Sequence, residues 1–232
     1  MRLPRVRFTV LGLMAAVAGA GVATWRLVDQ PIRRERAIAA ARRAGGFVQL
    51  DGEHQEHRVT PRPAPTAAGA WAEWLGTGFA HEVSVASLDG APVRDADLPA
   101  LEGLTGLRRL YLNGTPVTDA GLAHLRGLTA LEVLELRETA VGDAGLRHLA
   151  GLPRLSELRL YSTRVTDAGA ALLVRLPRLE ELSLSHTSVG DAGLAALAGC
   201  PTLRVLRLSG TGVTDAGVAA FREARPGVLV IR

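Results

Sequence analysis

The 232 residues of this chain are enough for one domain with a well-buried core and an appendage. All 27 basic side chains are arginines, which excludes chemistry that needs a lysine, and the single cysteine excludes an intramolecular disulfide. Residues 1–70 carry 11 arginines against 5 acidic residues, whereas residues 71–232 carry 16 against 18. The high isoelectric point therefore belongs to the N-terminal part, and the rest of the chain does not indicate a nucleic-acid-binding surface.

The first segment, residues 1–30, has the pattern of a membrane-directed helix. Arginines precede residues 8–25, which carry no charge, and Arg26 follows them. A signal anchor and a single-pass membrane protein are favoured, because the apolar run nearly reaches the ~20 residues of a membrane span. The alternative is a signal peptide cleaved after the small residues 16–18 or 18–20, which would give a secreted or periplasmic protein. Arginines flank the run on both sides and leave its orientation open.

Residues 31–69 predict a juxtamembrane basic helix followed by a proline-rich linker. Residues 32–44 have the helical pattern, residues 47–50 are predicted to be extended, and prolines alternate with other residues through 61–65. Residues 70–82 are predicted to form an N-terminal cap, because the open end of a repeat array needs an apolar cover. The covering side chains would be those of Trp71, Trp74 and Leu75 on one face of a short helix, with Phe79 just beyond. A ligand-binding aromatic cluster is the alternative.

The remainder, residues 83–232, is an internal repeat with a period of 24 residues. Equivalent leucines begin the five full copies; they are Leu107, Leu131, Leu155, Leu179 and Leu203. A degenerate copy precedes them, which makes six, and residues 228–231 are predicted to add a closing strand. A strict period of this length predicts a solenoid in which each copy packs on its neighbours.

Each copy predicts a strand, a turn and a short helix. In the second copy Leu110 and Leu112 alternate with Tyr111, which is the pattern of a strand with one buried face. The hydroxyl of Thr115 and its equivalents can bond to backbone groups of the turn. Thr118 and its equivalents, threonine or glycine, and the aspartate that always follows are predicted to start the helix, where a side-chain oxygen or a negative charge meets unpaired amides. Because strands stack at about 4.8 Å and helices at about 10 Å, the sheet should line the concave side of an arc.

The pattern LxxLxLxxTxVTDAGLxxLxxL resembles the leucine-rich repeat family, in particular the variety of bacterial repeat proteins and of eukaryotic F-box and ribonuclease-inhibitor-like proteins. The resemblance covers residues 83–231. The expected fold class is α/β: a right-handed leucine-rich-repeat solenoid with a concave parallel sheet and convex short helices, preceded by one transmembrane or signal helix. One departure is Thr115 and its equivalents, where many members have asparagine or cysteine.

Few side chains of the repeats have the pattern of a catalytic or metal site. Cys200 occupies a leucine position and is predicted to be a core residue. His124 and His148 are equivalent in adjacent copies, but they lack an acidic or cysteine partner in register, so exposed helix positions are favoured over metal ligation. The five aspartates at equivalent positions, from Asp119 to Asp215, are better explained by helix capping than by calcium binding, because a calcium-binding loop needs several carboxylates within one loop. No catalytic group, metal or cofactor is expected.

The outward positions of the strands are the candidate binding surface, since the repeat leaves them free to vary. In copies two to four they are rich in arginine and tyrosine, which are enriched in binding hot spots. The candidate partner-binding residues are Arg109, Tyr111, Glu135, Arg137, Glu157, Arg159, Tyr161 and Arg207. The competing interpretation is a salt-bridged sheet surface, with Glu135 beside Arg159 on neighbouring strands.

These features favour a membrane-anchored, non-catalytic interaction module that binds a protein or peptide on its concave face. A structural spacer of the cell envelope without a dedicated ligand is the alternative. An enzyme or an F-box-like adaptor is disfavoured, because no catalytic constellation stands out and an apolar segment and a linker precede the repeats. The sequence leaves the partner and the oligomeric state open.

Overall fold

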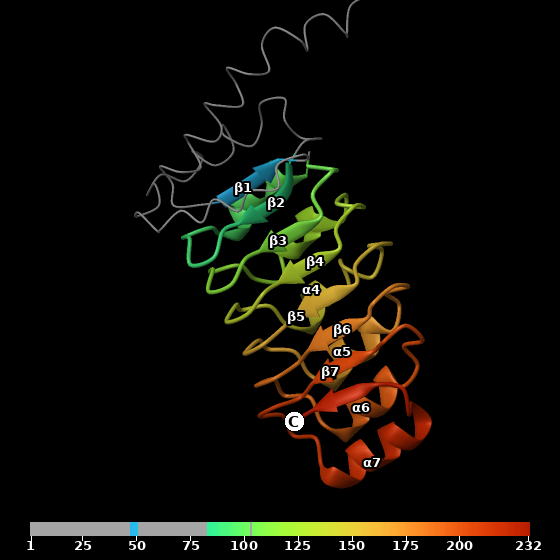
Figure 1. Ribbon diagram of the computed structural model, residues 1–232. Helices are drawn as coiled ribbons and strands as arrows, with labels where there is room; N and C mark the ends of the chain where they lie inside the picture. The colour runs from blue at the N-terminus through green and yellow to red at the C-terminus, as the bar shows by residue number, and fades with distance from the viewer. Residues whose placement is uncertain (1–46, 51–82, 103) are drawn as a thin grey trace, which may run out of the picture. The chain divides into compact units, whose positions relative to one another are not determined.

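The computed structural model describes residues 47–50 and 83–232, except residue 103. One sheet contains eight strands in chain order (Figure 1). The strands are β1 (Phe47–Leu50), β2 (Val83–Ser87), β3 (Arg109–Tyr111), β4 (Val133–Glu135), β5 (Glu157–Arg159), β6 (Glu181–Ser183), β7 (Val205–Arg207) and β8 (Leu229–Ile231). The segment 1–30, the basic helix 32–44, the proline-rich stretch and the cap 70–82 lie outside the described residues.

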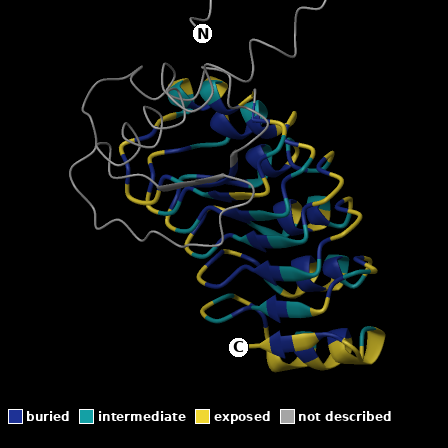
Figure 2. Cartoon of the chain, turned by 45° about the horizontal axis from the view of Figure 1, so that its top comes forward, coloured by how far each residue is buried: buried dark blue, intermediate teal, exposed yellow. Residues whose placement is uncertain are grey.

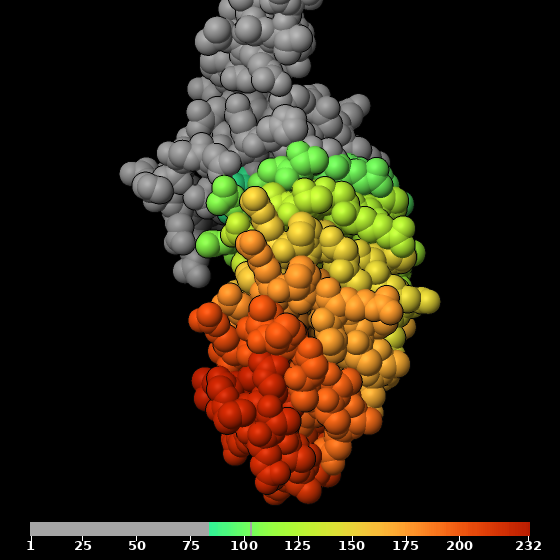
Figure 3. Space-filling view, turned by 90° about the vertical axis from the view of Figure 1, so that its right-hand side faces the viewer, coloured from blue at the N-terminus to red at the C-terminus, as the bar shows by residue number. Residues whose placement is uncertain are grey.

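Short helices connect successive strands and lie to one side of the sheet (Figure 1). They are η1 (Asp95–Leu101), η2 (Gly121–Leu125), α4 (Asp143–Leu146), α5 (Asp167–Leu173), α6 (Asp191–Leu197) and α7 (Asp215–Ala224). The first two are 3₁₀ helices, and η1 contains Pro99. Each copy is therefore a strand, a turn and a short helix, as the sequence predicts, and the copies follow one another as bands of colour in Figure 3.

Strands β2 to β8 are parallel, and each pairs with the next at a constant offset of 24 residues. This register aligns one buried leucine from each strand β3 to β7, and all five are 0% exposed: Leu110, Leu134, Leu158, Leu182 and Leu206. Figure 2 shows the buried residues in the strands and on the inner sides of the helices. The core is therefore one continuous stack shared by neighbouring copies.

Both edges of the described sheet are formed by short segments outside the full copies. The residues predicted to be extended form β1, which pairs antiparallel with β2, Phe47 opposite Ser87. The sequence did not indicate this pairing. At the other edge β8 pairs parallel with β7, so the predicted closing strand is confirmed.

The threonines after the strands bond as the sequence predicts. Each hydroxyl donates to the carbonyl of the leucine three residues earlier, for example Thr115 Oγ1 to Leu112 O at 2.7 Å and Thr163 Oγ1 to Leu160 O at 2.8 Å. The equivalents Thr139, Thr187 and Thr211 make the same bond. Every one of these bonds closes a turn within its own copy, so the threonines stabilise each turn separately.

The aspartates of α4 to α7 lie in the first turn of their helices, as predicted, for example Asp143 in α4, but their carboxylates accept no capping bond there. Asp143 instead reaches the next copy, where Oδ1 accepts from Thr166 N at 2.8 Å and Oδ2 accepts from Thr166 Oγ1 at 2.6 Å. Asp119 likewise accepts from Gly142 N at 2.6 Å. The helix-capping oxygen, where one is present, belongs to the preceding threonine, as in Thr166 and Thr214. The aspartates therefore tie successive copies together along the helix side.

Candidate interaction surface on the sheet

The outward side chains of β2 to β7, with the first outward residue after each of these strands, form a surface that we call the sheet face. Strand pairing aligns Tyr111 with Glu135 and Glu135 with Arg159. Three of the predicted binding residues therefore lie side by side on adjacent strands. Arg207 lies farther along, because Ser183 separates it from Arg159 in the same row.

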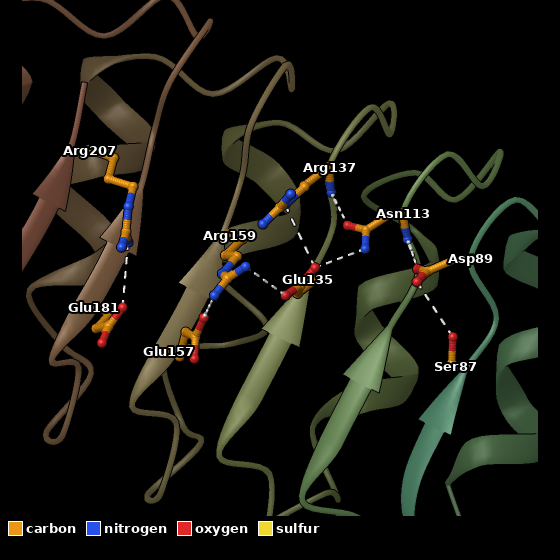
Figure 4. A network of polar contacts seen from close by, with 9 residues as sticks. All are labelled: Ser87, Asp89, Asn113, Glu135, Arg137, Glu157, Arg159, Glu181 and Arg207. Atoms are coloured by element: carbon orange, nitrogen blue, oxygen red, sulfur yellow. Dashed lines mark hydrogen bonds and ion pairs between the residues drawn. The ribbon is translucent and has the colours of Figure 1, made fainter. Parts of the chain in front are cut away.

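Glu135 is the centre of a polar network on the sheet face (Figure 4). It is only 8% exposed, and Oε1 lies 3.1 Å from Arg159 Nη1. Its other oxygen, Oε2, accepts from Asn113 Nδ2 at 2.9 Å and lies 3.6 Å from Arg137 Nε. The predicted pairing of Glu135 with Arg159 is thus confirmed, and the carboxylate is compensated within the protein.

Asn113 and Asp89 extend this network, although neither was among the predicted site residues. Asn113 donates its backbone N–H to Asp89 Oδ1 at 2.8 Å, and its Oδ1 accepts from Arg137 N at 2.9 Å. Burial raises the pKa of Asp89, and the charge of Glu135 adds to this, while hydrogen bonds from Asn113 oppose it. Both Asn113 and Asp89 are polar residues at the first outward position after a strand, and this pattern in the sequence could have identified them.

Of the other charged residues of the sheet face, some form ion pairs and one, Arg109, forms none with a described residue. Arg159 also pairs with Glu157, which joins Glu157 to the Glu135 network. Arg207 Nη1 lies 3.4 Å from Glu181 Oε2 in a separate pair (Figure 4). Arg109 is exposed, and no described residue forms a hydrogen bond or ion pair with its guanidinium. The sheet face therefore contains both compensated and uncompensated charges.

The two tyrosines stand in different surroundings. Burial raises the pKa of the Tyr111 hydroxyl, so this group is neutral at physiological pH. The ring of Tyr161 meets the ring of His186 edge-on, with centroids 4.9 Å apart and an angle of 64° between the planes. Both tyrosines are partly exposed, and charged groups such as Glu135 and Arg159 surround Tyr111, a combination suited to protein recognition.

The remaining sequence-derived candidates lie away from this surface. Cys200 is a free, buried cysteine, as predicted, and burial raises the pKa of its thiol. His124 is only partly exposed and has the acidic partner that the sequence analysis did not find, because Nδ1 lies 2.6 Å from Glu102 Oε1. His148 contacts Arg126, and burial and this arginine lower its pKa. Among the described residues, no group of three His, Cys, Asp or Glu side chains could hold a metal ion.

In the parts of the chain that the structure describes, no helix is both long enough and apolar enough to cross a membrane. The predicted anchor, residues 1–30, lies outside those parts.

The comparisons with known proteins support the fold. A family model described as Leucine Rich repeat matches residues 176–198 and 199–221. Among solved structures, internalin C2 of Listeria monocytogenes is similar with a TM-score of 0.53 and 20% sequence identity, over 84% of this chain and 80% of that chain. No curated protein sequence matches significantly. The family model therefore covers two of the copies, and the described repeats have the fold of a leucine-rich repeat solenoid; the likeness to the internalin concerns the fold alone.

Proposed function

We propose that this protein is a membrane-anchored, non-catalytic interaction module that binds a protein or peptide on the sheet face. Leucine-rich repeats are generally protein-interaction modules, and this generality supports the coarser part of the proposal. The anchor would be residues 1–30. The partner-binding residues would be those named from the sequence, centred on Tyr111, Glu135 and Arg159.

The observation that carries the proposal is the ordered set of polar side chains around Glu135. Arg159 and Arg137 are held by this carboxylate, with the Arg159 side chain 31% exposed and that of Arg137 41% exposed. Side chains fixed before binding lose less conformational entropy when a partner arrives. A planar guanidinium in a fixed orientation also favours a partner whose acceptor groups match the directions of its N–H donors.

A structural spacer without a dedicated ligand is the second candidate, and the same ion pairs favour it. Glu135 is satisfied by groups of its own chain, and Glu181 pairs with Arg207. A surface whose charges compensate one another needs no partner to be stable. The two candidates predict different effects of removing the uncharged tyrosine side chains: partner binding should weaken for an interaction module and stay unchanged for a spacer.

Replacement of both tyrosines, Tyr111→Ala with Tyr161→Ala, tests the binding proposal. Partners captured by the full-length protein are identified and their affinities measured for wild type and variant. Binding should weaken by about 2 kcal/mol or more if the tyrosines are hot spots, while the melting temperature stays nearly unchanged. The control is Arg147→Ala with Arg175→Ala, since both residues are exposed and lie outside the sheet face. Equal capture by wild type and both variants would leave the spacer as the better account.

The anchor is tested by fractionation of cells that express the whole chain. Membrane sedimentation that resists high salt is expected, because an apolar segment and not the arginines should hold the protein. A soluble protein whose N-terminus begins near Gly19 or Gly21 would show cleavage of a signal peptide and contradict the anchor.

A further inference from the structure

The outward arginine at the start of β3, Arg109, has valines beside it on both neighbouring strands. Strand pairing places Val85 on one side and Val133 on the other. Farther along the same row, Glu157 is neutralised by Arg159. Arg109 is exposed, and no described residue forms a hydrogen bond or ion pair with its guanidinium. At this position neither neighbouring strand therefore supplies a counter-ion.

The outward charges of copies two to four leave one positive charge in excess. These positions carry three arginines, Arg109, Arg137 and Arg159, against two acidic residues, Glu135 and Glu157. Arg137 and Arg159 both form ion pairs with Glu135, and Arg159 also pairs with Glu157. The two carboxylates are therefore matched by two of the arginines, and the excess charge is that of Arg109.

The hydroxyl of Tyr111 lies on the same face of β3 as Arg109. Residues two apart on a strand are about 7 Å apart at Cα, so these two long side chains can reach a common point. Burial raises the pKa of Tyr111, and among the nearby charges that of Arg109 has the largest effect and opposes this rise, which places the guanidinium near the hydroxyl. No described residue forms a hydrogen bond with this hydroxyl. A neutral O–H donor and a free guanidinium are therefore available together.

We infer that Arg109 and the hydroxyl of Tyr111 form a subsite for a carboxylate side chain, aspartate or glutamate, of the partner bound on the sheet face. The guanidinium would donate two parallel N–H bonds to the carboxylate oxygens, and the Tyr111 O–H would donate a third. Val133, partly exposed beside Arg109, would contact the methylene groups of the ligand. This inference rests on the proposed function and names the chemistry of one residue of the partner.

The surroundings of the subsite favour an anion over a cation. Glu135, which pairs with Tyr111 across the strands, is only 8% exposed, and its oxygens are bound by Arg159 and Asn113. An incoming carboxylate therefore meets one free positive charge at Arg109 and a negative charge that is already neutralised. A cationic side chain would meet the free positive charge and be repelled.

The sequence named Arg109 and Tyr111 as binding residues but did not separate Arg109 from the other outward arginines. Arg137 and Arg159 have the same residue type and face the same way. Only the side-chain contacts show that these two guanidinium groups already have a carboxylate partner, while that of Arg109 has none among the described residues.

Titration of the full-length protein, solubilised in a neutral detergent, with acetyl-glutamate amide tests the subsite. The probe should shift the NMR signals of the Arg109 Nε–H and of the backbone amides of Leu110 and Tyr111. The dissociation constant should be on the order of tens of millimolar, as for one hydrogen-bonded charge pair. Acetyl-glutamine amide has nearly the same shape without the charge, so it should bind several-fold more weakly.

Four results would overturn the inference. Equal shifts from both probes would show that the charge is not recognised, and shifts that do not saturate would show that there is no site. Stronger binding of acetyl-arginine amide would reverse the sign of the ligand. Stronger binding of acetyl-alanine, which offers a chain-terminal carboxylate, would assign the subsite to a chain terminus and not to a side chain.

Two variants localise the binding. Arg109→Gln keeps a polar side chain without the charge and should abolish the shifts, and Tyr111→Phe removes only the hydroxyl and should weaken the probe about threefold. The matched control is Arg164→Gln, because Arg164 is exposed, lies outside the sheet face and has no described partner for its guanidinium. The control should bind the probe as wild type does. Unchanged binding in Arg109→Gln or in Tyr111→Phe would contradict the subsite.

Failure of the subsite can be distinguished from failure of the proposed function. If the tyrosine double variant loses its partners while the glutamate probe does not bind wild type, the sheet face binds partners by other chemistry and the subsite is wrong. If the probe binds as expected while the tyrosine double variant keeps every partner, the carboxylate subsite stands and the tyrosines are not hot spots.

Discussion

A glycine two positions after each aspartate is required by the packing of one copy on the next. A Cβ built on Gly193 would lie 2.5 Å from Asp167 Oδ1 and 3.0 Å from Asp167 Cα. The same conflict exists at Gly145, where the distance to Asp119 Oδ1 would be 2.6 Å. The aspartate and the glycine of the repeat therefore belong to one contact between copies.

Gly193→Ala is expected to lower the free energy of unfolding by about 1–3 kcal/mol, because the methyl group forces the copies apart or displaces the Asp167 carboxylate. Urea unfolding of the full-length protein measures the change. Gly151→Ala is the matched control, since a Cβ at Gly151 meets nothing within 4 Å. Equal stability of the two variants would show that the close approach at Gly193 is absent.

The turn after each strand contains one residue in the left-handed region. Three copies have glycine there, Gly90, Gly114 and Gly210, with φ between 64° and 69°. The other three have Glu138, Ser162 and His186, with φ of 55° to 57°. For a residue with a Cβ this conformation costs roughly 1–2 kcal/mol.

Glu138→Gly is therefore expected to stabilise the protein by about 0.5 kcal/mol, since relief of the strain outweighs the greater freedom of glycine in the unfolded chain. Thermal or urea unfolding measures the change. Ala220→Gly in α7 should have the opposite effect and destabilise by about 1 kcal/mol, because its helical backbone gains nothing from glycine. A loss of stability in Glu138→Gly would contradict the left-handed conformation.

At the scale of elements, carboxylates connect each helix start to the next. Asp191 accepts from Thr214 N at 2.8 Å and from Thr214 Oγ1 at 2.7 Å, so it joins the start of α6 to the start of α7. These two hydrogen bonds lower the pKa of Asp191, and the charge of Arg232 adds to the effect. The connection depends on the charged form, which makes the packing of the last two copies sensitive to acid.

The sign of this dependence follows from the lowered pKa. A carboxylate whose pKa is lower in the folded than in the unfolded chain stabilises the fold above its unfolded pKa, about 4, and this stabilisation is lost as the pH falls through the folded value. Asp191→Asn should therefore lose less stability than wild type between neutral pH and about pH 3, measured by urea unfolding. Glu223→Gln, at an exposed position with no described hydrogen bond, should follow the wild-type profile. An Asp191→Asn profile parallel to that of wild type would contradict the lowered pKa.

At the scale of the whole molecule, the described copies share one apolar core. Leu158 is 0% exposed and pairs in register with Leu134 and Leu182, which are also 0% exposed. A single leucine is therefore packed by both neighbouring copies, and removal of its side chain opens a cavity that neither copy can fill by itself.

Leu158→Ala is expected to lower the free energy of unfolding by about 2–5 kcal/mol. Leu229→Ala is the control, because Leu229 is 59% exposed on β8, and its loss should change stability by about 0.5 kcal/mol or less. Both are measured by urea unfolding of the full-length protein. A loss of less than about 1 kcal/mol in Leu158→Ala would show that the position is not part of a shared core.

The repeat itself determined the architecture. A leucine recurring every 24 residues, with period-two alternation around Tyr111, predicts the strands, their parallel stacking and the buried rows. It also predicts Cys200 as a core residue and the threonine bonds, because these depend on a residue's place within its own copy. Local spacing is enough for such features, since their partners lie a few residues away or repeat with the same period.

Only the tertiary structure decided which groups meet between copies. Spacing correctly placed Asp143 at its own helix start, but the hydrogen-bond partner of its carboxylate is Thr166 of the next copy. The hydrogen bond from Asn113 to Glu135 likewise depends on side chains from neighbouring strands. The repeat period shows which residues occupy equivalent positions. Which side chains of neighbouring copies meet depends on how the copies pack against one another, and the period alone does not determine this packing.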